Sequence, residues 1–149
     1  MTDPAIRVFY SYSRQDREMR DRLDDHLSHL RRSGKIVTWC DLQLEPGSEW
    51  EKTLLEKLET SDIILLLVSA RFLASDYCSE TELKRAIDRH NVGKAHVIPV
   101  ILKSCLWNVS DLPFSKLQVL PTGAKPISSY RDEDEAYADV LGSRRKIAR

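Results

Sequence analysis

The chain has 149 residues, of which 42% are apolar and 31% are charged, a composition that supports one domain with a hydrophobic core and not two domains of ordinary size. Basic and acidic residues number 23 each, so no face-wide basic field is available to bind a nucleic-acid backbone. The longest apolar run, Ile63–Val68, is far shorter than the roughly 20 residues that span a bilayer, and the N-terminus lacks a cationic signal-peptide start. These features predict a cytoplasmic protein that binds neither nucleic acid nor membrane.

The three cysteines, Cys40, Cys78 and Cys105, form no CxxC pair, and none has a histidine at metal-ligand spacing. Such scattered thiols favour buried or bystander cysteines over disulfides or zinc ligands. We therefore expect no metal and no resident cofactor.

Short runs of β-forming residues alternate with segments that carry apolar residues at helical spacing. The predicted elements in chain order are a strand at Ile6–Tyr10, a helix with Met19, Leu23, Leu27 and Leu30 on one stripe, a strand at Lys35–Cys40, a helix at Glu49–Thr60, a strand at Ile63–Val68, a helix at about Tyr77–Asn91, a strand at Ala95–Leu102, a short strand near Pro126–Tyr130 and a last helix from Asp132.

The run Ile63–Val68 is apolar at every position, which is typical of a central parallel strand with both faces covered. Alternating strands and helices of this length indicate a parallel sheet with helices on both faces, and right-handed crossovers leave few topologies. The predicted fold is α/β: a flavodoxin-like doubly wound five-stranded parallel sheet with strand order 2-1-3-4-5, in a single domain over residues 1–149.

Ligands of such sheets bind beyond the carboxyl ends of the strands. The candidate ligand-binding segments are therefore Ser11–Arg14, Asp41–Trp50 and Ser69–Glu82. A phosphoacceptor receiver domain would need acidic residues after the first strand and an aspartate after the third, where this chain has Ser11-Tyr12-Ser13 and Ser69. A flavodoxin or dinucleotide fold would need a glycine-rich turn, but the five glycines are isolated and form no GxG. Neither class fits.

Five motifs follow one another in these regions, and a VIPV strand comes later at residues 97–100. They are FYSYSR at 9–14, WCD at 39–41, LEPGSEW at 44–50, SDIILLLVS at 61–69 and FLASDYCSETEL at 72–83. In this order and spacing they resemble a TIR domain of the bacterial and plant kind, over about residues 5–145. The resemblance implies either cleavage of NAD+ at the nicotinamide-ribose bond or a scaffold that holds signalling complexes together.

The resemblance also implies roles for individual residues. Glu82 occupies the position of the catalytic carboxylate, Trp50 that of an aromatic that stacks on nicotinamide, and Arg14 is placed to bind the pyrophosphate. The same rim includes Tyr10, Ser11, Asp41 and Tyr77. A single carboxylate suffices chemically, because nicotinamide leaves a cationic substrate as a neutral molecule and needs no general acid.

Ordinary structural explanations exist for two of these residues. The spacing Ser79-x-x-Glu82 fits a helix capping box, and Trp50 shares a helical stripe with Leu54 and Leu58. Glu82 shares a helix face with Ala86, whose small side chain would leave room for a ligand. Glu80 lies about 200° away around the same helix axis.

The loop after the second strand carries a Pro-Gly pair suited to a type II turn. In the family this loop contacts a neighbouring TIR domain, so the resemblance implies an interface made by Leu44, Glu45, Pro46, Gly47 and Ser48. We expect an NAD+ nucleosidase, either a hydrolase or a cyclase, that is activated by self-association and acts in signalling or defence. We also expect the domain to be the N-terminal effector module of a longer protein. The alternative is a non-catalytic TIR scaffold for homotypic protein interactions.

Overall fold

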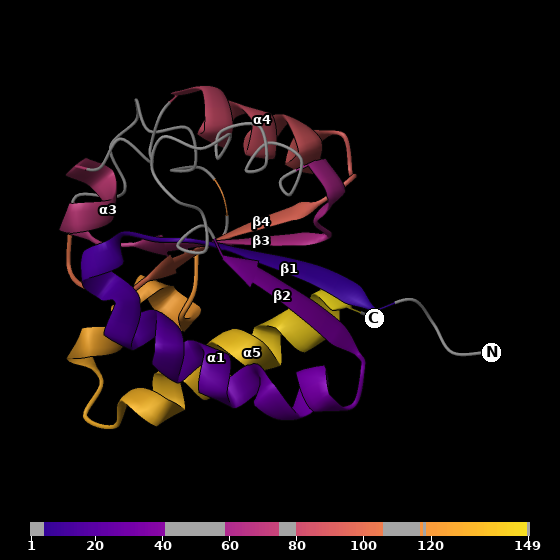
Figure 1. Cartoon of the computed structure of the whole chain (residues 1–149). Coiled ribbons are helices and arrows are strands. Elements are labelled where there is room, and N and C mark those ends of the chain that lie inside the picture. The colour runs from indigo at the N-terminus through magenta and orange to yellow at the C-terminus, as the bar shows by residue number, and fades with distance from the viewer. Residues whose placement is uncertain (1–4, 41–58, 75–79, 106–116, 118, 149) are drawn as a thin grey trace.

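The computed structural model describes residues 5–40, 59–74, 80–105, 117 and 119–148. The strands are β1 (Ile6–Ser11), β2 (Ile36–Cys40), β3 (Ile63–Val68) and β4 (His96–Ile101), and the α-helices are α1 (Arg17–Arg32), α3 (Ala70–Ala74), α4 (Glu80–Asn91) and α5 (Glu133–Ala148) (Figure 1). Short 3-10 helices lie at η1 (Arg14–Asp16), η4 (Thr122–Ala124) and η5 (Ile127–Ser129). No helix in these ranges is long and apolar enough to cross a membrane.

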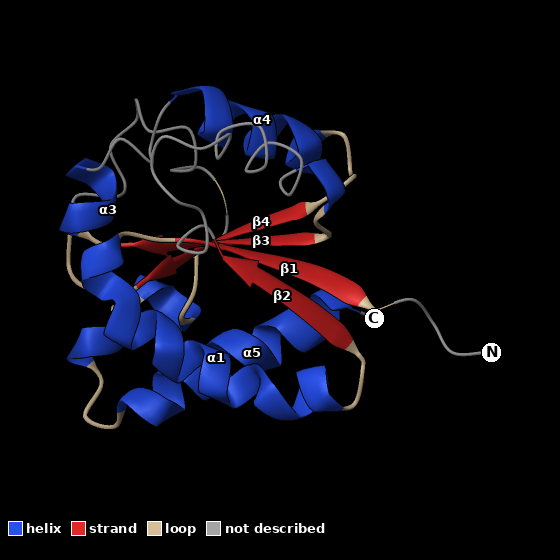
Figure 2. Ribbon diagram, in the orientation of Figure 1, coloured by secondary structure: helices blue, strands red, loops and turns tan. Residues whose placement is uncertain are grey.

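The described strands form one parallel sheet in the order β2-β1-β3-β4. Helices α1 and α5 cover one face of this sheet and α4 covers the other (Figure 2). The α/β class, the parallel sheet and the order of its first four strands are as the sequence predicts.

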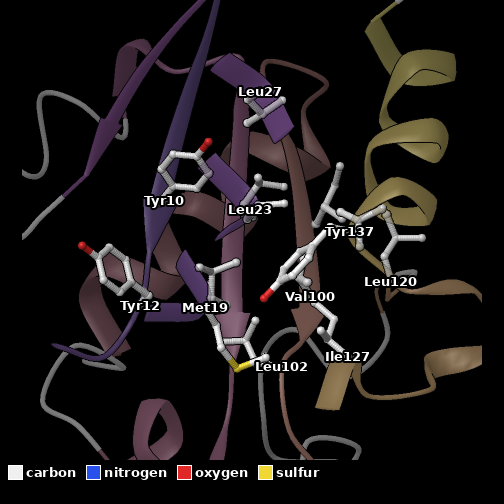
Figure 3. Close-up of a cluster of buried hydrophobic side chains, with 14 of the residues drawn as sticks. Tyr10, Tyr12, Met19, Leu23, Leu27, Val100, Leu102, Leu120, Ile127 and Tyr137 are labelled. Atoms are coloured by element: carbon white, nitrogen blue, oxygen red, sulfur yellow. The ribbon is translucent and has the colours of Figure 1, made fainter. Parts of the chain in front are cut away.

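Strand β3 is buried along its whole length, because β1 and β4 flank it and helices cover both of its faces. Its side chains alternate between two core clusters: Ile63, Leu65 and Leu67 pack toward α1 and α5, while Ile64, Leu66 and Val68 pack toward α3 and α4. Figure 3 shows the first cluster, to which α1 contributes Met19, Leu23 and Leu27. The continuous apolar run therefore reflects burial on both faces, as predicted.

The predicted strand near Pro126–Tyr130 is wrong. This segment holds the 3-10 helix η5, and the place beside β4 is taken by Leu120, which makes a single parallel bridge to Val100. The Leu120 amide donates to the Pro99 carbonyl at 2.9 Å, and the Ile101 amide donates to the Leu120 carbonyl at 2.8 Å. The next residue is a proline, which has no amide hydrogen to continue the ladder. Among the described residues the sheet thus has four strands and one bridge.

Helices α1 and α4 each end shortly before a glycine, and α4 ends at Asn91 as the sequence predicts. Helix α1 ends as the chain reaches Gly34, whose φ of 76° is in the left-handed region that glycine adopts readily, and α4 ends in the same way at Gly93 with a φ of 77°. The short helix α3 has too few residues to show a helical period, and the sequence did not predict it. Most of the predicted helix Glu49–Thr60 lies outside the described residues.

Candidate functional site

The strand order reverses between β1 and β3. From β1 the chain crosses through α1 to β2, and from β3 it crosses through α3 and α4 to β4 on the opposite side. In open α/β sheets a ligand binds outside the carboxyl ends of the strands at such a switch point. The candidate site is therefore the sheet edge where Ser11 ends β1 and Ser69 follows β3.

Buried polar side chains gather at this edge. Of the five buried polar or charged residues in the described part of the chain, four lie here: Ser11, Ser13, Asp16 and Ser69. Asp16 is 2% exposed and Ser69 is 1% exposed. Buried polar groups are costly unless they are hydrogen-bonded, so their concentration at one place requires a local network.

The network joins the segments that follow β1 and β3. The Ser69 hydroxyl donates to Oδ2 of Asp16, and the Phe72 amide donates to Oγ of Ser69 at 3.1 Å. The Asp16 amide donates to the Ser13 carbonyl at 2.8 Å. The second carboxylate oxygen of Asp16, Oδ1, is buried and has no hydrogen-bond partner within the described structure.

Cys105 follows β4 at the same edge of the sheet. Burial raises the pKa of this thiol above its ordinary value of 9.0, and the negative charge of Asp16 raises it further. The thiol therefore stays protonated at neutral pH and is a poor nucleophile or metal ligand. No group of three or more His, Cys, Asp or Glu that could hold a metal ion is found in the part of the chain that is described.

The expectation that Tyr10 lines the rim is wrong. Its side chain is 1% exposed and packs in the cluster beneath α1 (Figure 3). Its hydroxyl donates to Oδ1 of Asp24 at 3.3 Å. The cause is strand alternation, because Tyr10 shares the parity of Val8 and both face α1. Ser11, the next residue, does lie at the carboxyl edge.

Glu82 lies in the first turn of α4, one turn before Ala86. Because α4 leads from the end of β3 back to the start of β4, its first turn belongs to the carboxyl edge of the sheet. The room expected beside Ala86 is absent, since Ala86 is 1% exposed and packs against the sheet in the second core cluster. The side chain of Glu82 lies outside the described atoms.

The remaining predicted residues are placed in part or not at all. Arg14 begins η1, directly before the buried network, and its side chain is not described. Outside the described residues lie Asp41, Trp50, Tyr77 and the interface loop Leu44–Ser48. The sequence reasoning missed Asp16 and Ser69, although an aspartate directly before an amphipathic helix and a serine directly after a buried strand were both available as signals.

The strand order and the polar residues at the carboxyl edge of the sheet define a doubly wound α/β domain with a candidate site at the switch between β1 and β3. The chain belongs to the TIR domain family, whose model matches residues 8–141. An uncharacterized protein of Sinorhizobium fredii, y4lF, is 45% identical over 141 residues, which are 95% of this chain and 43% of that relative. The chain thus spans less than half the length of this curated relative.

Solved TIR domains share the fold. The TIR domain of the Toll-related receptor TRR-2 from Hydra magnipapillata superposes with a TM-score of 0.64 at 19% identity, covering 95% of this chain and 98% of that one. The TIR domains of the activated Roq1 resistosome, which directly recognizes the pathogen effector XopQ, give a TM-score of 0.63 at 18% identity, covering 93% of this chain and 99% of theirs.

Proposed function

We propose that this domain is an NAD+ nucleosidase that cleaves the nicotinamide-ribose bond, with the carboxylate of Glu82 as its catalytic residue. The observation that carries the proposal is the position of Glu82 in the first turn of α4, which follows the carboxyl end of the central strand β3. Ligands of doubly wound sheets bind at this edge, and membership of the TIR family supports the same assignment.

The proposed reaction needs one carboxylate and no metal. The bond between ribose C1′ and the nicotinamide nitrogen breaks, and its electron pair returns to the pyridinium ring, so nicotinamide leaves as a neutral molecule. The ribose becomes oxocarbenium-like, and the Glu82 carboxylate stabilises this positive charge. Water adds to C1′ and loses a proton to give ADP-ribose, or a nucleophile within the ADP-ribosyl group adds to give a cyclic product.

The size of this electrostatic effect is sufficient to matter. Two unit charges about 4 Å apart interact by roughly 4 kcal/mol at an effective dielectric constant of about 20. Each factor of ten in rate corresponds to about 1.4 kcal/mol, so one carboxylate can contribute up to about a thousandfold.

Five other residues keep a proposed part in binding NAD+. Trp50 stacks on the cationic nicotinamide ring, Arg14 binds the pyrophosphate, and Ser11, Asp41 and Tyr77 line the same rim. The position of Ser11 at the end of β1 supports its place in this set. Tyr10 is excluded, because its side chain is in the core.

We further propose that the site is completed by a second copy of the domain through the loop Leu44–Ser48. The Roq1 TIR domains act within a resistosome, and the likeness of fold favours a similar use of assembly here. The matched region is only 43% of the relative y4lF, which favours a module that is fused to other regions. Its proposed role as an effector in cytoplasmic signalling or defence rests on membership of the TIR family.

The test is nicotinamide release by purified protein. Glu82→Gln should reduce release to background while the melting temperature changes by a few degrees at most, because the loss of a cap side chain costs about 1 kcal/mol. Glu80→Gln is the matched control, since it makes the same chemical change two positions earlier on another face of α4 and should stay active. Full activity in Glu82→Gln contradicts the assignment, and no release by the wild-type protein even at high concentration favours the scaffold.

A further inference from the structure

Asp16 uses its carboxylate in an unexpected way. Aspartate is a preferred N-cap residue, and Asp16 stands directly before α1, yet its side chain makes no capping hydrogen bond to that helix. Its Oδ2 instead accepts a hydrogen bond from Ser69, which lies 53 residues further along the chain. The carboxylate therefore links two segments and does not serve its own helix.

Ser69 completes a chain of hydrogen bonds between two helix starts. Its Oγ accepts from the Phe72 amide in the first turn of α3 and its hydroxyl donates to Asp16 at the start of α1. Both residues are buried, so water does not compete for these bonds, and hydrogen bonds in series strengthen one another at low local dielectric. The N-terminus of α1 also favours the negative charge of Asp16.

The contact lies where the sheet no longer holds the two segments together. The pairing of β1 with β3 runs from Val8 with Ile63 to Ser11 with Leu66 and extends no further. Asp16 and Ser69 lie beyond this last pair, on the loops that leave the switch point. On the β1 side the loop is braced against α1, because the guanidinium of Arg20 lies 5.3 Å from the ring centre of buried Tyr12.

We propose that Asp16 and Ser69 are positioning residues, whose hydrogen bond sets the separation between the loop that carries Ser11 and Arg14 and the segment that leads through α3 to Glu82. This inference rests on the proposed function, in which these loops hold the substrate and the catalytic carboxylate. Neither residue touches the substrate in this proposal, because both are buried below the edge.

A contact at the opposite edge of the sheet provides a matched control. Asp62, directly before β3, accepts a hydrogen bond from the Arg7 amide of β1 at 2.8 Å, and the Arg7 side chain lies 3.6 Å from the same oxygen. The Asp62 contact links β1 and β3 at their amino ends, whereas the Asp16 contact links the segments that follow the same two strands at their carboxyl ends. Asp62→Asn therefore perturbs a carboxylate between β1 and β3 without reaching the candidate site.

The first measurement is steady-state nicotinamide release, at a temperature well below the melting transition of every variant. Ser69→Ala should lower kcat by about ten- to a hundredfold, since small displacements of catalytic groups have effects of this order. Ser69→Thr, which keeps the hydroxyl, should recover most of this loss, and Asp62→Asn should stay within about twofold of wild type. Wild-type kcat in folded Ser69→Ala, or an equal loss in Asp62→Asn, overturns the proposal.

The second measurement is hydrogen exchange of two amides, which does not depend on activity. The Phe72 amide reports on the β3 side and the Asp16 amide, bonded to Ser13, reports on the β1 side. Ser69→Ala should accelerate exchange at both amides, whereas Asp62→Asn should accelerate neither. Acceleration at Phe72 alone means that the loops are not coupled, and the inference fails.

The two measurements separate the inference from the proposed function. If wild-type protein releases no nicotinamide, the proposed function fails and the exchange result alone decides whether the contact couples the loops. If Ser69→Ala does not fold, Asp16→Asn replaces it, because it keeps the side-chain shape and substitutes a weaker neutral acceptor. If Asp16→Asn has the kcat of wild type, the inference is overturned. If the wild-type protein is inactive, the inference is overturned when the Phe72 amide of Asp16→Asn exchanges at the wild-type rate.

Discussion

Tyr137 of α5 offers a stability prediction that follows directly from its surroundings. The residue is 0% exposed, and Figure 3 shows its ring within the cluster that also contains Met19 and Val100. Its hydroxyl has no hydrogen-bond partner within the described structure. Burying a hydroxyl without a partner costs about 1–3 kcal/mol in proteins. Tyr137→Phe removes this cost and keeps the ring, which lies 5.5 Å from that of His26.

We expect Tyr137→Phe to increase the free energy of unfolding by about 1 kcal/mol at pH 8, which corresponds to a rise in melting temperature of about 2–4 °C. The assay is urea unfolding followed by circular dichroism, with the two proteins compared at matched pH. A variant less stable than wild type by more than about 1 kcal/mol would mean that the hydroxyl makes a stabilising hydrogen bond, and the reasoning would be refuted.

The pH dependence gives a second, independent readout of the same hydroxyl. Burial, and after it the charge of Glu133, raises the pKa of Tyr137 from 10.0 to about 12. Between these values the unfolded chain has lost the phenol proton and the folded chain keeps it, so stability falls as pH rises from 10 toward 12, by about 1.4 kcal/mol per pH unit. Below pH 10 this contribution is fully present. Tyr137→Phe has no phenol proton to lose, so its advantage in free energy of unfolding over wild type should increase by up to about 3 kcal/mol across this pH range. Parallel pH profiles of the two proteins would contradict the burial argument.

Three further predictions concern assembly, substrate binding and surface electrostatics. Activity per protomer should fall as the protein is diluted over about a hundredfold range, because a shared site assembles by mass action; a constant value means that one chain carries a complete site. Trp50→Ala should lower nicotinamide release strongly while Trp50→Phe keeps most of it, and equal inactivity of the two folded variants would rule out aromatic stacking. The ion pair between Arg22 and Glu133, at 3.0 Å, should give a coupling energy of only about 0.2–1 kcal/mol in a double-mutant cycle, because both side chains are partly exposed; a coupling above about 2 kcal/mol would contradict solvent screening.

The elements that the sequence predicts correctly are those whose signal is local and periodic. Met19, Leu23 and Leu27 recur at helical spacing, and all three are buried in α1 as that spacing requires. The run Ile63–Val68 is apolar throughout, and β3 is buried on both faces. The strand order followed from chain alternation and crossover handedness, which are general properties of parallel sheets.

The errors have a different origin. The motif that contains Tyr10 ends at the site, but strand alternation directs this side chain into the core. Ala86 is small because α4 packs closely on the sheet at that point, and not because a ligand occupies the space. The residues Pro126–Tyr130 contain β-forming side chains, yet it is Leu120 that reaches the edge of β4. In each case a composition that fits two environments was assigned to the wrong one.

The sequence by itself determined the class of fold, the positions of the main strands and helices, and the family, because repeating apolar patterns and ordered motifs are visible along the chain. Only the tertiary structure decided that Asp16 and Ser69 are partners, since they are 53 residues apart and each has an ordinary local explanation as a helix cap. A side-chain hydrogen bond depends on which segments meet in space, and the two loops meet here because β1 and β3 are neighbours in the sheet and end at the same edge.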